Sequence, residues 1–223
     1  MTATPAAASP TSVPSIARSA AFATGPTRKA RIERSTRETS ITADLVLDGS
    51  GRASVKTGIG FLDHMLATLA LFARFDLDLI AQGDLHVDDH HTSEDCFIVL
   101  GQALDKALGD RAGLVRFGHA YAPLDESLAR AVVDLATRIT ASIDLGLTRP
   151  TVGQWACENI THALHTLAAS ARLTLHVDVL KGANDHHRAE AAFKALGLAL
   201  RDAVRRDPTL SPTDVSNSTK GVL

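Results

Sequence analysis

The chain repeats part of itself, and this internal duplication limits the folds that it can adopt. Residues 90–107 match residues 186–203 at nine of eighteen positions without a gap. Just upstream, residues 64–74 match residues 162–172 at seven of eleven positions. The offset is 96 residues for the first pair and 98 for the second, so two residues were gained or lost in a connecting loop. The duplication predicts two similar structural units.

Each unit shows a readable pattern of helices and strands. Apolar residues recur at helical spacing in both longer segments, so each HHxxE motif is expected to open an amphipathic helix. Gly109 and Pro208 are expected to end these two helices. Helices are also expected near His64 and His162, each followed by a strand, FDLDLIA or RLTLHVDV. Alternating segments further upstream, such as TSITADLVLDGSG, predict further strands.

The order of elements in each half is therefore strands, helix, strand, helix. It predicts an α+β fold with an internal duplication of two similar halves, each a small mixed sheet with helices packed on one face. The first repeat is expected to span residues 29–112 and the second residues 113–208.

The first 28 residues differ from the rest in composition. They are rich in Ala, Ser and Thr, contain four prolines and carry no acidic residue. Such a segment is expected to be a disordered tail, because it cannot bury enough apolar surface to offset its ordering entropy. An organellar transit peptide is the alternative, since these are also acid-poor and Ser-rich, but four prolines disfavour the amphipathic helix used in targeting.

The repeated motif carries the chemistry that most suggests a function. Glu94 follows His90 by four residues and His91 by three, so on a helix it can stand beside either imidazole. With the upstream histidines, the two halves offer six imidazoles and two carboxylates as candidate metal ligands: His64, His90, His91, Glu94, His162, His186, His187 and Glu190.

This set of nitrogen and oxygen donors contains no thiolate, so it suits Mn, Fe or Zn rather than a Cys-type structural zinc site. Two octahedral ions need about twelve donors, so eight protein ligands would leave positions for water or substrate. Asp88, Asp89 and Asp185 are candidates to orient the ring N–H groups of the ligands.

Cations near the same helices suggest an anion site. Arg116, Arg138 and Lys194, together with the closing NSTKGVL, would suit a phosphate group. Taken singly, each is more typical of a solvated surface charge. Lys194 is the best candidate, because it follows Glu190 by four residues and shares its helix face.

Composition excludes several other classes of protein. The formal net charge of -2 gives no reason to expect a nucleic-acid partner. There is no run of about eighteen apolar residues, so no membrane span is expected. Cys96 and Cys157 form no metal-type spacing and no disulfide framework, which favours a reducing compartment and a cytoplasmic location.

Several motifs, taken in order, resemble the imidazoleglycerol-phosphate dehydratase family. They are RETSI, LDGSG, TGIGFLDHML, GDLHVDDHHTSED, RFG, PLDES, NDHHRAEAAFKA and STKGVL, and they cover the chain from about Arg28 to Leu223. The resemblance implies a hydro-lyase of histidine biosynthesis that dehydrates D-erythro-imidazoleglycerol phosphate to imidazole acetol phosphate. It also implies duplicated α+β halves, two Mn²⁺ ions per active site, and a large homo-oligomer, usually of 24 subunits, with sites between subunits.

The resemblance further implies roles for individual residues. The eight residues named above would be the metal ligands, with Glu190, or alternatively Glu94, shuttling protons and Asp125 as a supporting acid. A substrate contact is implied near Glu38, and residues 209–223 would close over the substrate. Phosphate contacts are implied at Arg116, Arg138, Lys194, Ser218 and Lys220.

Some positions depart from the family pattern. Phe72 stands where the family commonly has His, LATRI replaces a typical LSGRP around Arg138, and SNSTKG replaces the usual Pro-Ser-Ser or Pro-Ser-Thr ending. Two other functions use the same histidines: a non-catalytic oligomer that stores metal or is held together by it, and a dinuclear hydrolase of phosphate esters. The first gives no reason for Arg116, Arg138 and Lys194 to converge, and the second predicts cleavage of an ester rather than loss of water.

Overall fold

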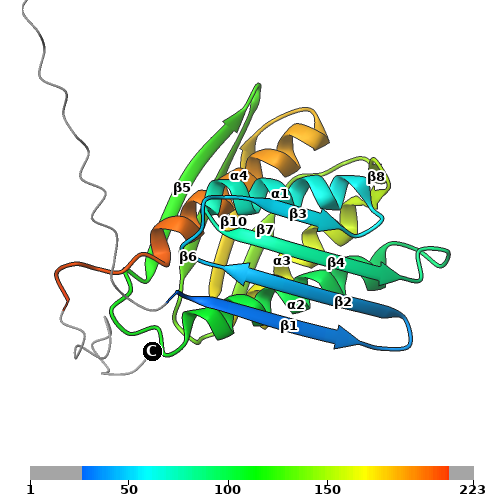
Figure 1. The fold of residues 1–223 in the computed structure, drawn as a ribbon. Helices are drawn as coiled ribbons and strands as arrows, with labels where there is room; N and C mark the ends of the chain where they lie inside the picture. The colour runs from blue at the N-terminus through cyan, green and yellow to red at the C-terminus, as the bar shows by residue number, and fades with distance from the viewer. Residues whose placement is uncertain (1–26, 211–223) are drawn as a thin grey trace, which may run out of the picture.

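The computed structural model describes residues 27–210, which form two halves of the same topology (Figure 1). The first half contains β1 (Lys29–Ser35), β2 (Thr39–Val46), β3 (Ala53–Lys56), α1 (Gly60–Ala73), β4 (Asp76–Gly83) and α2 (His90–Leu108). The second contains β5 (Phe117–Leu124), β6 (Ser127–Asp134), β7 (Thr140–Asp144), α3 (Cys157–Ser170), β10 (Thr174–Lys181) and α4 (Asp185–Ala203). A short hairpin, β8 (Thr151–Val152) and β9 (Trp155–Ala156), precedes α3.

The two sheets have matching strand orders, β1-β2-β4-β3 and β5-β6-β10-β7. In each sheet the first three strands are antiparallel, and the last is parallel to its neighbour. Both sheets are therefore mixed, and the predicted fold class is confirmed.

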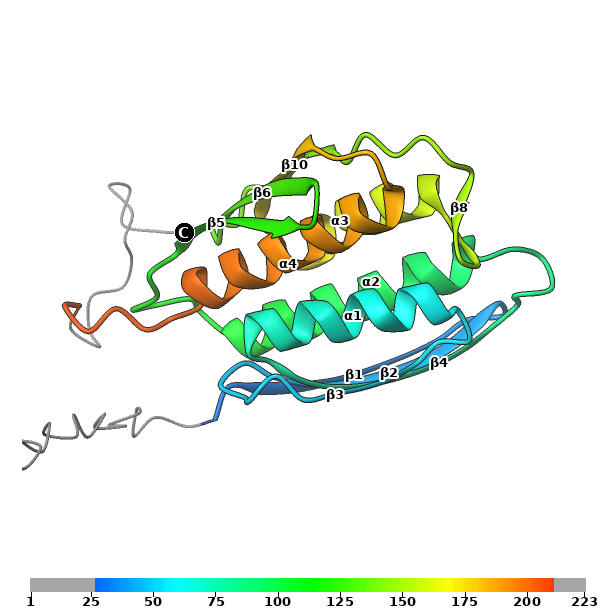
Figure 2. The same ribbon diagram turned by 90° about the horizontal axis from the view of Figure 1, so that it is seen from above.

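The helices lie between the two sheets (Figure 2), with α1 and α2 on the first sheet and α3 and α4 on the second. Strand β2 shows why one face is covered: Ile41, Ala43 and Leu45 are buried, while the residues between them are not. Helix α1 packs against α4, and α2 packs against α3. The core of the molecule is therefore formed between the halves as well as within them.

Two glycines at matched positions of the repeat allow this close packing. A Cβ on Gly101 of α2 would lie 2.6 Å from Cβ of Ser170 in α3, and one on Gly197 of α4 would lie 2.8 Å from Cβ of Phe72 in α1. A side chain at either glycine would push the helices apart. Because the metal-type residues lie on these four helices, the glycines also set the spacing of the site.

The ends of the long helices agree with the sequence only in part. Helix α2 ends at Leu108, and Gly109 follows with φ of 62°, as expected. Helix α4 ends at Ala203, so the prediction that it runs to Pro208 is wrong. The backbone of residues 205–207 instead bonds across to residues 113–115, which draws the chain away from the helix axis.

The predicted tail and closing segment lie mostly outside the described residues, at 1–26 and 211–223. Arg28, placed in the tail by its composition, belongs to the folded part: its Nε donates to Oδ2 of Asp48 over 2.9 Å and its Nη1 donates to the carbonyl of Val204 over 2.6 Å. No helix within residues 27–210 is long and apolar enough to cross a membrane.

Candidate metal centres

Two groups of His and Glu side chains lie at the N-terminal ends of the helices. In the first, which we call the Glu190 triad, the ligand atoms of His64, His186 and Glu190 lie within 4.8 Å of one another. Oε2 of Glu190 lies 3.1 Å from Nε2 of His64 and 3.2 Å from Nε2 of His186. Three donors thus point toward one common position.

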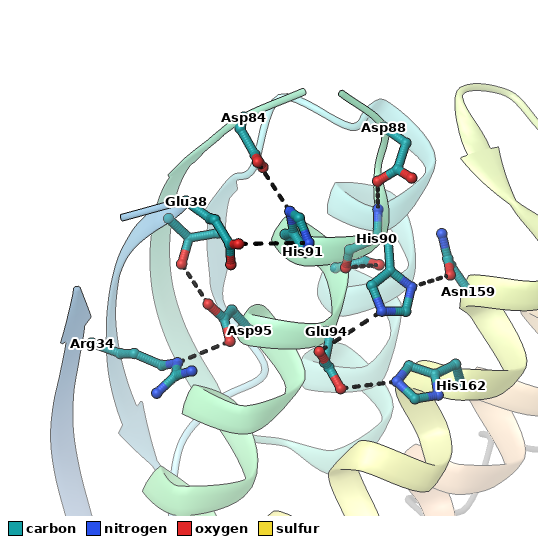
Figure 3. A network of polar contacts seen from close by, with 12 residues as sticks. Arg34, Glu38, Asp84, Asp88, His90, His91, Glu94, Asp95, Asn159 and His162 are labelled. Carbon is teal, nitrogen blue, oxygen red and sulfur yellow. Dashed lines mark hydrogen bonds and ion pairs between the residues drawn. The ribbon is translucent and has the colours of Figure 1, made fainter. Parts of the chain in front are cut away.

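The second group, the Glu94 triad, consists of His90, Glu94 and His162 and meets the same 4.8 Å criterion (Figure 3). Oε1 of Glu94 lies 2.9 Å from Nε2 of His162, and Oε2 lies 3.9 Å from Nε2 of His90. The sequence repeat therefore produces two similar clusters.

Each triad combines residues from both halves of the chain. The His and Glu four residues apart come from a long helix, α2 or α4, and the third member comes from the short helix of the other half. This exchange follows from the packing of α1 on α4 and of α2 on α3. The ligand types were predictable from the sequence, but this crossed pairing was not.

The second histidine of each HH pair points away from the triads of its own chain. The ring of His91 is turned by 75° from that of His90, and the ring of His187 by 89° from that of His186. Nδ1 of His91 lies 3.0 Å from Oδ2 of Asp84. Nδ1 of His187 lies 2.7 Å from Oε2 of Glu126.

Acidic side chains thus surround both outward histidines. The hydrogen bond that His91 donates to Asp84 raises the pKa of His91, and the bond that His187 donates to Glu126 raises the pKa of His187. In return, the hydrogen bond from His187 holds the pKa of Glu126 well below its usual range. These carboxylates orient the rings and leave Nε2 as the atom that can bind a cation.

Two predicted substrate or catalytic residues lie beside these rings. Glu38, just before β2, places Oε1 3.9 Å from Nε2 of His91. Asp125, in the turn between β5 and β6, places Oδ2 3.8 Å from Nε2 of His187. The two hairpins thus present an acid at equivalent places.

The prediction that Asp88, Asp89 and Asp185 orient the ring N–H groups is wrong. Their carboxylates accept hydrogen bonds from backbone N–H groups: Asp88 from His90, Asp89 from Ala156, and Asp185 from residues 148 and 149. The ring partners are instead Asp84, Glu126 and Asn159. They lie in two connections and on α3. Asp84 and Glu126 fall within GDLHVDDHHTSED and PLDES but outside the duplicated blocks that predicted the ligands, and Asn159 falls in no quoted motif.

The predicted phosphate-binding residues are spread along the molecule. Nζ of Lys194 lies 2.9 Å from Oε1 of Glu190, at the Glu190 triad. Burial opposes ionisation of Glu190, but the hydrogen bonds from Lys194 and His64 outweigh it and lower its pKa.

Arg116 and Arg138 lie away from the triads of their own chain. Arg116 pairs with Asp134 through bonds of 2.7 and 3.1 Å, and its backbone N–H donates to Ala203, at the opposite end of α4 from His186. Arg138 precedes β7 and lies beside Thr174, where β10 begins. Ser218 and Lys220 lie outside the described residues.

The donors present in the triads fit a divalent metal ion. Each triad offers two imidazoles and one carboxylate, the donor types that Mn, Fe and Zn share. Three donors leave an octahedral ion about half coordinated. The chemistry of each triad therefore calls for further ligands.

Residues 57–200 match the family model described as "Imidazoleglycerol-phosphate dehydratase". The chain belongs to this family. A dehydratase of this name from Phytophthora nicotianae is 57% identical over 196 residues; the match covers 88% of this chain and 42% of that protein. The one from Chloroflexus aggregans is 53% identical over 196 residues, with 88% of this chain and 95% of that protein covered.

Solved structures of the family have the same fold. The imidazoleglycerol-phosphate dehydratase of Staphylococcus aureus superposes with a TM-score of 0.73 at 35% identity, covering 80% of this chain and 99% of that one. The Pyrococcus furiosus structure, a complex with (S)-C348, gives 0.73 and 35% and covers 86% and 100%. The predicted membership of the family is confirmed, and with it a place among the hydro-lyases.

Proposed function

We propose that this protein is a metal-dependent hydro-lyase that converts D-erythro-imidazoleglycerol phosphate to imidazole acetol phosphate in histidine biosynthesis, using two Mn²⁺ ions per active site. Family membership supports the reaction. The observation that carries the metal dependence is the pair of triads, in which six donors converge at two positions. A cytoplasmic location fits the two reduced cysteines, Cys96 and Cys157.

The outward histidines suggest how the coordination is completed. Each triad needs more donors, and His91 and His187 each present Nε2 away from their own triads. We therefore propose that these two side chains bind metal at the triads of a neighbouring copy, in a large homo-oligomer of 24 subunits. All eight predicted ligands would then be used.

The same arrangement would complete the phosphate site. Arg116 and Arg138 lie too far along the molecule to meet the triads of their own chain. In the proposed oligomer they approach from a neighbouring copy, while Lys194 contributes from the chain that holds the Glu190 triad. Ser218 and Lys220 would add their donors from the C-terminal segment.

The reaction removes a hydroxyl from the carbon next to the imidazole ring and a proton from the adjacent carbon. When bound, the ions would supply Lewis acidity toward the ring nitrogens, which helps an electron-rich ring to expel the hydroxyl. Glu190 would take the C–H proton and return a proton to the departing hydroxyl, which leaves as water. Asp125 and Glu38, beside the outward histidines, would hold the substrate hydroxyls. The enol that remains becomes the ketone of the product.

Removal and return of the metal tests this proposal. Treatment with a chelator should abolish the dehydration of imidazoleglycerol phosphate, and added Mn²⁺ should restore it. Full activity after complete removal of metal would refute the metal dependence. If metal binds but the phosphorylated imidazole is neither converted nor raises the melting temperature, the protein is instead a non-catalytic metal-binding oligomer. Release of inorganic phosphate from the substrate would indicate a hydrolase.

A further inference from the structure

The two triads differ at one matched position that contacts an HH motif. Phe61 in α1 lies three residues before His64, and Asn159 in α3 lies three residues before His162. Oδ1 of Asn159 lies 2.9 Å from Nδ1 of His90. The ring of Phe61 instead packs against the ring of His186, with centroids 4.9 Å apart.

The contact with Asn159 fixes the form of the His90 imidazole. A neutral imidazole carries one N–H, and the nitrogen that keeps it is set by its hydrogen-bond partner. If Nδ1–H donates to Oδ1 of Asn159, the lone pair of Nε2 is free and faces Glu94 (Figure 3). Asn159 is only 5% exposed, so water does not compete strongly for this bond.

His186 has no equivalent support. Within residues 27–210, nothing hydrogen-bonds to its Nδ1, and Phe61 holds the ring by packing alone. Both neutral forms of this imidazole are therefore accessible, and only one of them leaves Nε2 free to bind a cation. Selecting that form costs free energy, and this cost weakens metal binding at the Glu190 triad.

A second difference acts in the same direction. The ammonium of Lys194 pairs with the carboxylate of Glu190 over 2.9 Å, whereas the matched position in α2 is Ile98. A cation entering the Glu190 triad must share that carboxylate with Lys194. Among the described residues, Glu94 pairs with two histidines and with no Lys or Arg.

We infer that Asn159 is a positioning residue that makes the Glu94 triad the tighter metal site, so that the two sites fill in order. The inference rests on the proposed function, because it needs both triads to bind metal. It assigns part of the difference in affinity to the side chain at one matched position, Asn159 or Phe61, beside the effect of Lys194.

The test measures metal binding directly in the full-length protein. After removal of metal, the protein is titrated with Mn²⁺, and free Mn²⁺ is followed by its electron paramagnetic resonance signal. The wild type should show two affinity classes. Asn159→Leu keeps a similar volume but removes the acceptor, and it should weaken the tighter class by about 10- to 100-fold while sparing the weaker class.

Two further variants separate hydrogen bonding from packing. Asn159→Asp keeps an oxygen that can only accept, so it should retain the tighter class. Phe61→Leu changes only the packing beside His186 and should leave the tighter class unchanged. Unaltered binding by Asn159→Leu, or equal losses in Asn159→Leu and Asn159→Asp, would overturn the inference.

The reciprocal variant tests the claim independently of how well Asn159→Leu folds. Phe61→Asn places an acceptor beside His186 and should strengthen the weaker class; no change in that class would count against the inference. A wild type that is active with Mn²⁺ but binds it in one class would refute the asymmetry and leave the function intact. Two classes without Mn²⁺-dependent dehydration would refute the function alone.

Discussion

The two halves share a topology, but they differ in the hydrogen bonds that hold the loop before the third strand of each half, β3 or β7. Asp76 begins β4, and its Oδ1 accepts hydrogen bonds from the backbone N–H groups of Ser50, Gly51 and Arg52 at 2.8, 3.1 and 3.0 Å. At the matched position in β10, Thr174 donates one bond of 2.9 Å to the carbonyl of Arg138. The first half uses the position to fix a turn, and the second makes from it a single side-chain bond to the loop that carries a candidate phosphate ligand.

The same contrast appears at the triads. The first half contributes a long helix without a cation beside Glu94, and the second contributes one in which Lys194 pairs with Glu190. The matched glycines Gly101 and Gly197 and the matched core residues Phe97 and Phe193 are alike in the two halves, while residues at the site and its loops differ. The two halves therefore share their backbone fold and differ in the side chains around the triads.

The largest expected effect compares the two carboxylates. Glu190→Gln and Glu94→Gln each remove one negative charge from a triad and keep its shape. With Mn²⁺ at saturation, Glu190→Gln should lower kcat by about 10²- to 10⁴-fold, because it removes the proton-transfer group. Glu94→Gln should mainly raise the Mn²⁺ concentration needed for activity. Equal losses of kcat in the two variants would end the assignment of proton transfer to Glu190.

The next effect concerns the two loops. Asp76→Ala should lower the free energy of unfolding by about 2–4 kcal/mol, because three backbone donors lose a charged acceptor, and Thr174→Val by about 0.5–1.5 kcal/mol. Urea unfolding of the metal-free protein measures both. Similar losses would show that the two loops are held equally.

Acid should weaken only the first of these loops. The bond from Arg52, together with the backbone N–H donors, holds the pKa of Asp76 below its usual value of 3.8. This stabilisation is fully present above the pKa of the unfolded chain and is lost as the pH falls through the lower pKa of the folded state. The stability difference between wild type and Asp76→Asn should therefore shrink at low pH, whereas that of Thr174→Val should not.

A smaller effect is expected from Lys194, the ammonium group beside Glu190, because the matched position in α2 is Ile98. Lys194→Met should raise KM for the phosphorylated substrate by about 10- to 100-fold, the loss of one hydrogen bond to a charged group. Lys106→Met is the matched control, because Lys106 lies in the last turn of α2, far from either triad. Steady-state kinetics with both variants measure the difference, and an unchanged KM in Lys194→Met would exclude a phosphate contact there.

The smallest effect is a shift in the pH dependence of metal binding. A histidine must lose its proton to bind metal, so the raised pKa values of His91 and His187 mean that Mn²⁺ is released at a higher pH during acidification. Glu126→Gln lowers the pKa of His187, and Asp84→Asn does the same for His91. In each variant the loss of Mn²⁺ should move to lower pH in a titration followed by paramagnetic resonance. Movement to higher pH would contradict these carboxylates' role.

Much of the fold was readable from the sequence because both halves repeat the same periodic pattern. The duplicated apolar spacing located all four main helices, and the segments TSITADLVLDGSG, FDLDLIA and RLTLHVDV cover β2, β4 and β10. The first strand of each sheet, β1 or β5, was not singled out. The end of α4 was missed because its cause is distant: residues 205–207 pair with residues 113–115, and no local signal near Pro208 records that contact.

The ligand types of the site were also readable, but their grouping was not. The spacing of His90 and Glu94 follows from helical geometry alone. Their pairing with His162 depends on how α2 packs on α3, which is a property of the assembled halves. The ring partners Asp84, Glu126 and Asn159 lie outside the duplicated blocks, so helical spacing could not identify them, whereas the predicted partners were the aspartates nearest in sequence to the histidines.

The crossed pairing has a consequence for how such a protein can change. A polypeptide of half this length would contain the residue types of a triad but could not assemble one alone, because each triad needs helices from two halves. It would form pockets only by pairing with a second copy, and the two pockets would be identical. In that pair any substitution would change both pockets in the same way. Fusion of the two copies into one chain removed this constraint, so that one pocket could carry an asparagine and the other a phenylalanine at the matched position.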